Sequence, residues 1–225
     1  MSANLVRRVV AEGLGTALLI AVVVGSGMMG QRLFPGHDGL ALLANAIATG
    51  GGLVALIVTF GAVSGAHFNP VVTLTEAALG DRPWRDVPAY ALAQVAGGIA
   101  GVVITHAMFA HALIAPSTHA RTGGPLWLSE VVATFGLVMV VRGVGRARPA
   151  ALAPCVAAYI VAAYWFTPST SFANPAVTIA RCLTDTFAGI RPIDVPAFIA
   201  AQLVGAALAA ILCRWLHADA QEPAR

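Results

Sequence analysis

The sequence predicts an all-α integral membrane protein with six transmembrane helices and two re-entrant half-helices, arranged as an inverted repeat. Three observations carry this prediction: an apolar composition, six long apolar runs and a repeated Asn-Pro segment. Of the 225 residues, 58% are hydrophobic and only 10% are charged, with a mean hydropathy of +0.81. A soluble domain carries about a quarter charged residues, so the apolar surplus is expected to face lipid.

Six apolar runs are each long enough to cross a bilayer as a helix, which takes about 20 residues. They cover residues 6–30, 39–63, 87–113, 126–145, 149–167 and 195–216. The first run is too long for the apolar core of a signal peptide, contains Glu12 and has no convincing cleavage site after it. We therefore expect it to remain as the first transmembrane helix.

The distribution of arginines predicts the orientation of the chain. The sequence contains no lysine, and cytoplasmic segments of membrane proteins carry an excess of positive residues. With a cytoplasmic N-terminus, the arginines inside are Arg7, Arg8, Arg82, Arg85, Arg142, Arg146, Arg148, Arg214 and Arg225, and those outside are Arg32, Arg121, Arg181 and Arg191. Both termini are therefore expected in the cytoplasm. The net charge of +3 follows from topology and does not indicate a nucleic-acid partner.

Neither the cysteines nor the histidines form the pattern of a metal or redox site. Cys155, Cys182 and Cys213 are odd in number, widely spaced and mostly inside apolar runs, which indicates packing residues. The histidines between residues 106 and 119 lie near a predicted external loop, but their spacing is not that of metal ligands. We expect no metal, no cofactor and no enzymatic activity.

The motifs of the first half of the chain recur in the same order in the second half. The matching pairs are Glu12 and Glu130, Asn69-Pro70 and Asn174-Pro175, and Gln94 and Gln202. Three spans per half is an odd number, so the second copy enters the membrane from the opposite side. This predicts one domain over residues 1–225, with inverted repeats 1–120 and 121–217.

The two Asn-Pro segments predict half-helices that meet near the middle of the membrane. Asparagine is a strong helix N-cap, and proline suits the first helical position. The apolar segments 70–79 and 175–184 are too short to span a bilayer but long enough to reach one surface. The loops 64–68 and 167–173 must then re-enter the membrane, which is tolerated only around a cavity or inside protein. Both helix dipoles would aim their positive ends at one conduit, where hydroxylated solutes find donors and cations find a barrier.

On these residues the sequence resembles the aquaporins, or major intrinsic proteins, over essentially its whole length. The resemblance rests on Ser64-Gly65-Ala66-His67-Phe68-Asn69-Pro70-Val71, Asn174-Pro175-Ala176, Glu12, Glu130, Gln94 and Gln202. It implies a six-helix bundle that assembles as a homotetramer with one pore per protomer. It also implies that Asn69, Pro70, Val71, Asn174, Pro175 and Ala176 form the pore motifs.

A carboxylate inside a span suggests function by default, for example in a proton relay. Glu12 and Glu130 occupy the same repeat position, and no pattern of acids, lysines or histidines continues a relay. We therefore expect a structural role in binding backbone N–H groups of the re-entrant loops, as the resemblance implies. Gln94, Gln202 and His67 are expected to support the same loops.

The sequence departs from the family at the selectivity filter. Most aquaporins carry arginine directly after the second Asn-Pro-Ala, where this chain has Val177. Counting back from the two asparagines places the other filter positions at Thr49, Ala162 and Ser171. None of these residues is charged or aromatic, so a wider and less polar constriction is expected. The Gly50–Gly52 run fits either a widened lumen or close helix packing.

Arg181 lies four residues after Val177, on the same helical face one turn outward. One hypothesis places it at the outer vestibule, where it partly replaces the missing filter cation. The alternative is an arginine that snorkels or forms a salt bridge near Asp185.

The loss of the filter arginine resembles a bacterial aquaglyceroporin branch associated with arsenic resistance. That resemblance implies passive conduction of trivalent metalloid acids such as arsenite and of polyols such as glycerol, with water as a further permeant, across the bacterial inner membrane. The alternatives are a water-selective aquaporin, a secondary transporter with inverted repeats, and a structural junction protein. A transporter needs a coupling-ion site or a titrating relay, and the midplane offers only two asparagines.

Overall fold

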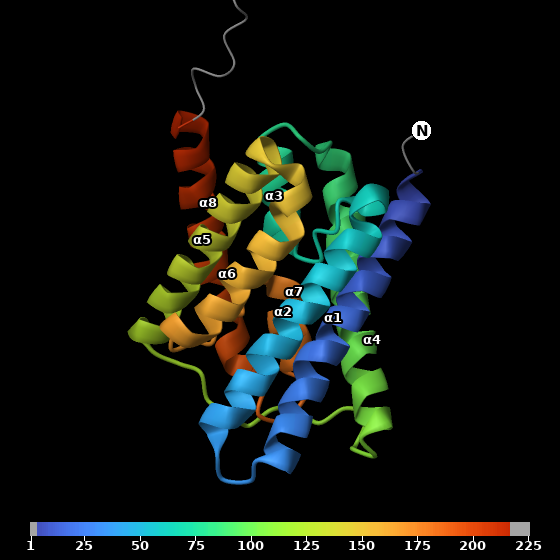
Figure 1. Ribbon diagram of the computed structural model, residues 1–225, viewed down its shortest axis with the longest axis vertical. Coiled ribbons are helices and arrows are strands. Elements are labelled where there is room, and N and C mark those ends of the chain that lie inside the picture. Colours follow the sequence, from blue (N-terminus) through green and yellow to red (C-terminus); the bar gives the residue numbers. More distant parts are fainter. Residues whose placement is uncertain (1–3, 217–225) are drawn as a thin grey trace, which may run out of the picture.

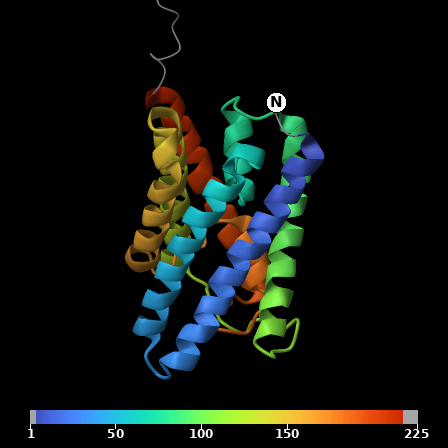
Figure 2. The same ribbon diagram turned by 45° about the vertical axis from the view of Figure 1, so that its right-hand side comes forward.

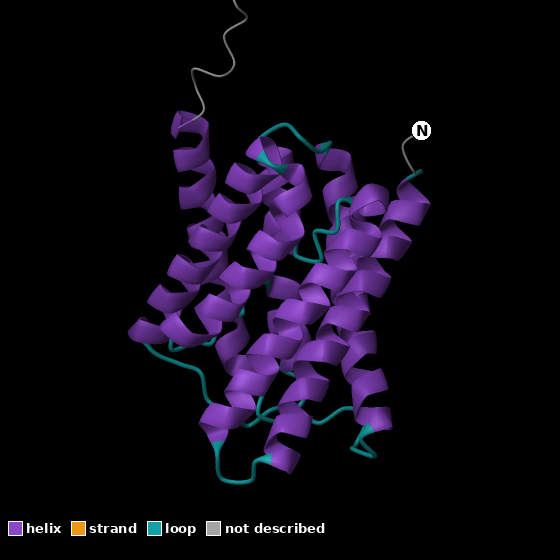
Figure 3. Ribbon diagram, viewed as in Figure 1, coloured by secondary structure: helices purple, strands orange, loops and turns teal. Residues whose placement is uncertain are grey.

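The computed structural model describes residues 4–216, and all regular structure among them is helical (Figure 3). Arg225, one of the arginines expected on the cytoplasmic side, lies outside this range. Six helical segments are long and apolar enough to cross a membrane. Their α-helices are α1 (Leu5–Leu33), α2 (Asp38–Ser64), α4 (Val87–Met108), α5 (Gly124–Ala147), α6 (Leu152–Phe166, which reaches this length together with the 3-10 turn before it) and α8 (Val195–Leu216). The six predicted spans are therefore confirmed.

One predicted boundary shifts for a local reason. The third span was expected to reach residue 113, but α4 ends at Met108 because Ala110 adopts a left-handed conformation with φ 55°. The backbone N–H of His111 donates to the carbonyl of His106 across this turn. The fifth span begins at residue 149 as expected, with a 3-10 turn, Pro149–Ala151, directly before α6.

Two short helices lie inside the bundle. α3 (Pro70–Ala78) and α7 (Pro175–Arg181) both begin near its middle and run in opposite directions (Figures 1 and 2). α3 leads toward the end where α1 begins and α8 finishes, here called the terminal end, and α7 leads toward the opposite, far end. The prediction of helix over 175–184 was too long, because the chain turns directly after Arg181, where the N–H of Leu183 donates to the carbonyl of Ala180.

Close helix contacts at two matching glycines hold each half of the bundle together. A Cβ on Gly97 of α4 would lie 2.1 Å from the carbonyl oxygen of Gly13 on α1. A Cβ on Gly205 of α8 would lie 2.4 Å from the carbonyl oxygen of Val131 on α5. Neither site can hold a larger residue unless the helices separate. Large apolar side chains such as Leu92 and Ile211 instead cover the outside, which is the surface that faces lipid.

Candidate functional site

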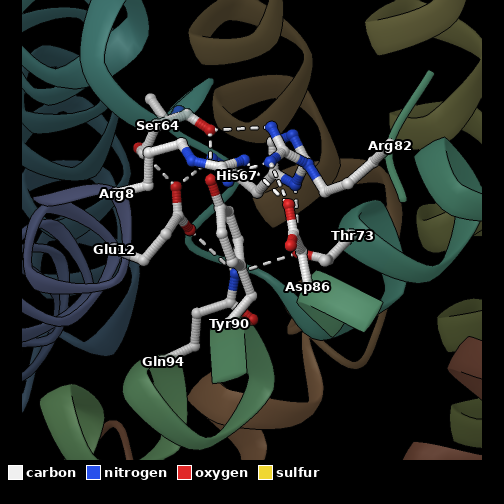
Figure 4. A network of polar contacts seen from close by, with 10 residues as sticks. Arg8, Glu12, Ser64, His67, Thr73, Arg82, Asp86, Tyr90 and Gln94 are labelled. Atoms are coloured by element: carbon white, nitrogen blue, oxygen red, sulfur yellow. Dashed lines mark hydrogen bonds and ion pairs between the residues drawn. The ribbon is translucent and has the colours of Figure 1, made fainter. Parts of the chain in front are cut away.

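The carboxylate of Glu12 binds the first re-entrant loop (Figure 4). It is fully buried and accepts hydrogen bonds from the backbone N–H groups of His67 (3.0 Å) and Phe68 (2.7 Å). The hydroxyl of Ser64 (2.6 Å) and the amide of Gln94 (2.8 Å) also donate to it. A charge-assisted network of this kind fixes a loop that has no helical bonds of its own.

The same arrangement recurs around Glu130. The backbone N–H groups of Phe172 and Ala173, both at 2.9 Å, and the amide of Gln202 at 2.7 Å donate to its carboxylate. Each glutamine also donates to a half-helix hydroxyl, Gln94 to Thr73 and Gln202 to Thr178. His67 reaches the hydroxyl of Thr73 as well, through Nδ1 at 3.0 Å.

The backbones of the two loops also match. Left-handed φ values occur at three positions of the first loop and at the three corresponding positions of the second. The pairs are Gly65 (95°) and Thr170 (61°), Ala66 (51°) and Ser171 (50°), and Phe68 (49°) and Ala173 (46°). For non-glycine residues this conformation costs about 1–2 kcal/mol each, so the glutamate bonds hold an otherwise unfavourable path.

Asn69 and Asn174 cap their half-helices and tie the two loops together. The side-chain oxygen of Asn69 accepts from the N–H of Val71, and that of Asn174 accepts from the N–H of Ala176. The Nδ2 of each asparagine donates across the midline at 2.8 Å, from Asn69 to the carbonyl of Ala173 and from Asn174 to that of Phe68. Each amide thus keeps a second N–H that no described residue accepts.

A cavity of about 320 Å³ passes the two asparagines and reaches toward both ends of the bundle. Asn69 and Asn174 line its middle. Its lining includes Glu76 on α3 at the terminal side and Arg181 on α7 at the far side. The half-helices therefore present their N-termini, with the dipoles' positive ends, to one shared space.

Three of the four expected filter residues line this cavity, namely Thr49, Ser171 and Val177. Ala162 does not. It is exposed on the outer face of α6, the same face as Trp165, so the count along the fifth span was wrong. The face of α6 on the cavity consists of residues four apart, namely Leu152, Val156, Ile160 and Tyr164. This periodicity was readable in the sequence and would have indicated Tyr164 in place of Ala162.

Arg181 is neither a snorkelling residue nor the partner of Asp185. It is 3% exposed and its guanidinium carbon lies 3.4 Å from the ring centroid of Phe172. Its Nε donates to the carbonyl of Ala188, and no described residue accepts from its two terminal nitrogens. The carboxylate of Asp185 instead accepts from the backbone and hydroxyl of Thr118.

A second arginine stands near the first. Arg121, from the loop between α4 and α5, lies 5.0 Å from the Phe172 ring centroid and donates to the carbonyls of Gly189 and Ser169. Burial lowers the pKa of Arg121 to about 10, so it remains a cation at neutral pH. Burial also lowers the pKa of His119, and the charges of Arg121 and then Arg181 lower it further. The far side of the cavity is therefore electropositive.

An ion cluster that was not predicted from the sequence lies at the terminal side of the cavity. Arg142 of α5 is 5% exposed, and its Nη1 lies 2.9 Å from Glu76 Oε1 and also contacts the carboxylate of Asp81. Arg82 lines the cavity nearby and donates to the hydroxyl of Tyr90 and the carbonyl of Ser64 (Figure 4). The only sign of this cluster in the sequence is that Glu76 lies seven residues after Asn69, at the half-helix position that matches Arg181.

Comparison with known proteins decides the family. The family model described as major intrinsic protein matches residues 1–167 and 144–224. The chain belongs to the major intrinsic protein family. It is 54% identical to the aquaglyceroporin AqpS of Rhizobium meliloti over 95% of this chain and 91% of the relative. It is 30% identical to a probable glycerol uptake facilitator protein of Thermotoga maritima over 67% of this chain and 70% of that protein.

A solved structure shares the fold of this family member. It is an X-ray structure of the aquaglyceroporin from Plasmodium falciparum, with a TM-score of 0.70 and 16% identity over 95% of this chain and 96% of that one. Together with the six apolar helices, these findings make the protein a multi-pass membrane channel for small solutes, and not an enzyme.

Proposed function

We propose that the protein conducts small uncharged hydroxylated solutes passively, with glycerol-like polyols and undissociated trivalent metalloid acids such as arsenite as its permeants, and water beside them. The observation that carries this proposal is the second side-chain N–H of Asn69 and of Asn174 beside the cavity, which no residue in the described part of the chain accepts. These donors, with the positive ends of two helix dipoles, suit the oxygen atoms of a neutral solute and oppose a metal cation. The names of the relatives in Rhizobium meliloti and Thermotoga maritima point to polyols as well.

The selectivity filter is proposed to include Thr49, Ser171 and Val177. Valine in place of a filter arginine leaves room beside α7 for solutes bulkier than water. Arg181 is proposed to supply the missing positive charge one helical turn further out, because no residue between 4 and 216 accepts a hydrogen bond from its terminal nitrogens. A neutral metalloid acid presents hydroxyls as a polyol does, so the same contacts serve both classes.

We further propose that residues 1–120 and 121–217 are inverted repeats of one channel domain. The matched bonds of Glu12 and Glu130 support this division. The arginine distribution supports an inner-membrane protein with both termini in the cytoplasm. Resemblance to the family supports a homotetramer with one pore in each protomer.

A stopped-flow swelling assay on proteoliposomes tests the proposal. Wild type should conduct glycerol and arsenite down their gradients, at rates that do not change when proton and sodium gradients are collapsed. Val177→Arg should abolish glycerol flux and keep water flux, because it narrows the filter. Dependence on either ion gradient would establish the transporter alternative, and wild-type flux of water alone would establish a water-selective channel.

A further inference from the structure

An acidic and a basic side chain line the terminal part of the cavity, and they come from different halves of the chain. Glu76 lies on α3 and Arg142 on α5, and both are part of the cavity wall. The part of the cavity that these two residues line together with Val141, Gly145 and Leu152 is called here the terminal chamber. It lies on the opposite side of the capping asparagines from Arg181.

Neither charge belongs to the arrangement that the two halves share. Arg142 lies twelve residues after Glu130, and the residue twelve positions after Glu12 is Val24. Glu76 likewise has no acidic counterpart on α7. The far half of the cavity is built without such a pair, so the half-helices and their loops do not need one. The pair is therefore a feature of the terminal chamber alone.

A turn at the end of α3 brings a second carboxylate next to Glu76. Gly80 has a φ of 87°, and beyond it the backbone N–H groups of Asp81 (2.9 Å) and Arg82 (3.2 Å) both donate to the carbonyl of Glu76. The carboxylates of Glu76 and Asp81 then converge on Arg142. One guanidinium is thus shared by two carboxylates, so Glu76 remains a strong hydrogen-bond acceptor.

Arg142 contacts these carboxylates through a single nitrogen. Its Nη1 lies 2.9 Å from Oε1 and 3.0 Å from Oε2 of Glu76, and it also contacts the carboxylate of Asp81. A guanidinium has five N–H donors, and no residue between 4 and 216 accepts from Nε or Nη2. The Nε is buried, and a buried donor without a partner is unfavourable unless water or a ligand completes it.

The chamber has room for a solute beside these groups. Gly145 lies three residues after Arg142 on the same helix and also lines the cavity, and a Cβ added to it would meet no atom within 4 Å. Val141 and Leu152 add apolar surface to the wall. The side chain of Glu76 is 17% exposed, so part of its carboxylate stays accessible from this space. The chamber therefore combines an acceptor, a donor and an apolar surface.

We propose that the terminal chamber is a binding site for small polyols, in which Glu76 accepts hydrogen bonds from the hydroxyl groups of the solute and Arg142 donates to them. Each hydroxyl is both a donor and an acceptor, so a carboxylate and a guanidinium side by side bind neighbouring hydroxyls of one molecule. The apolar wall contacts its carbon atoms. This inference rests on the proposed function, since it says where the polyol is held on the terminal side of the lumen.

The concentration dependence of glycerol flux tests the site. Tracer flux in proteoliposomes, measured over a range of glycerol concentrations, gives the concentration of half-saturation. The double variant Glu76→Gln, Arg142→Gln replaces the ion pair by two amides that can bond to each other. Half-saturation should then need about tenfold more glycerol, which is the effect of losing hydrogen bonds to charged groups. Water flux through the same variant shows that its pore is folded and open.

Two single variants separate the donors from the charge and from folding. Arg142→Lys keeps a cation between the two carboxylates but lacks the fork of N–H donors, so the half-saturating concentration should rise here too. A purely structural ion pair would leave it at the wild-type value, and that result would overturn the role of Arg142 as a donor. If the double variant gives no folded protein, Glu76→Gln alone serves, because Arg142 keeps its contact with Asp81.

A second ion pair at the same end of the bundle supplies the matched control. Nη1 of Arg8 lies 2.8 Å from Oδ2 of Asp86, and neither residue lines the cavity (Figure 4). The double variant Arg8→Gln, Asp86→Asn removes one positive and one negative charge, as the test variant does. Its half-saturating glycerol concentration should equal that of wild type.

The inference is overturned if the glutamine double variant passes water and keeps the wild-type half-saturating concentration. It is also overturned if the variant of Arg8 and Asp86 raises this concentration as much, or if wild-type glycerol flux rises linearly without saturating. A wild-type protein that passes no glycerol above empty liposomes would instead refute the proposed function itself.

Discussion

Glu76 and Arg181 occupy matching positions in the two half-helices, each seven residues after its capping asparagine, and both line the cavity. Their charges are opposite, and they differ in whether a group of opposite charge lies next to them. Arg142 lies against the carboxylate of Glu76, whereas no described carboxylate lies within 4.0 Å of Arg181. The lumen is thus neutralised on the terminal side and positive on the far side.

Removing the unpaired cation should weaken conduction. In Arg181→Ala we expect glycerol flux to fall at least about fivefold, because hydrogen bonds from a charged donor contribute about 1.5–3 kcal/mol. Swelling of proteoliposomes measures the effect. Arg191→Ala is the control, since Arg191 is half exposed, pairs with Asp194 and does not line the cavity. Flux that is unchanged for every permeant would end the assignment of Arg181 to the pore.

The ion pair on the terminal side of the cavity should contribute to the stability of the folded protein. Arg142→Gln leaves the carboxylate of Glu76 without its main partner, and we expect the free energy of unfolding to fall by about 3 kcal/mol. Adding Glu76→Gln to the same chain should recover most of this loss, because the two changes are coupled. Denaturant unfolding in detergent measures both variants. Equal stability of the single and double variants would mean that the pair does not act as a unit.

The two loop-binding glutamates should differ in importance. Glu12 accepts four hydrogen bonds, including one from the Ser64 hydroxyl, whereas Glu130 accepts three. We expect Glu12→Ala to lower the melting temperature more than Glu130→Ala, and both to reduce glycerol flux because a loop is released. Thermal unfolding in detergent ranks the variants. The reverse order would show that bond number does not govern loop stability here.

The α1–α4 contact should tolerate no side chain at Gly97. Gly97→Leu forces α4 away from the carbonyl of Gly13, and overpacking of this kind costs about 1–3 kcal/mol or more. Gly143→Leu is the control on α5, since nothing lies within 4 Å of its added Cβ. Yield of folded protein after gel filtration compares the two. A well-folded Gly97→Leu variant would contradict the observed backbone contact.

The spans and the half-helices were predictable because their signals are local. About 20 apolar residues identify a transmembrane helix, and Asn-Pro identifies the start of a half-helix at Asn69 and Asn174. Because Glu12 recurs as Glu130, the sequence also indicated which segments of the two halves correspond, which a single motif cannot do. These features depend on residue type and order, so they can be predicted without a structure.

The far side of the cavity was harder to predict because it depends on helix rotation. Counting back from Asn174 assumed a fixed path through the second loop, and a shift of two residues along α6 exchanges the outward Ala162 for the inward Tyr164. The partners of Arg142 were equally hard to predict from the sequence, because Glu76 and Asp81 lie more than sixty residues away in the chain.

The crossed amides of Asn69 and Asn174 have a consequence for how the protein is made. During synthesis the first half leaves the ribosome before the second, so the carbonyl of Phe68 must wait for Asn174 to be translated. Until then the carbonyl of Phe68 lacks the donor that it has in the folded protein. Neither half alone supplies the donor for its own loop carbonyl, so both bonds form only when the two halves come together.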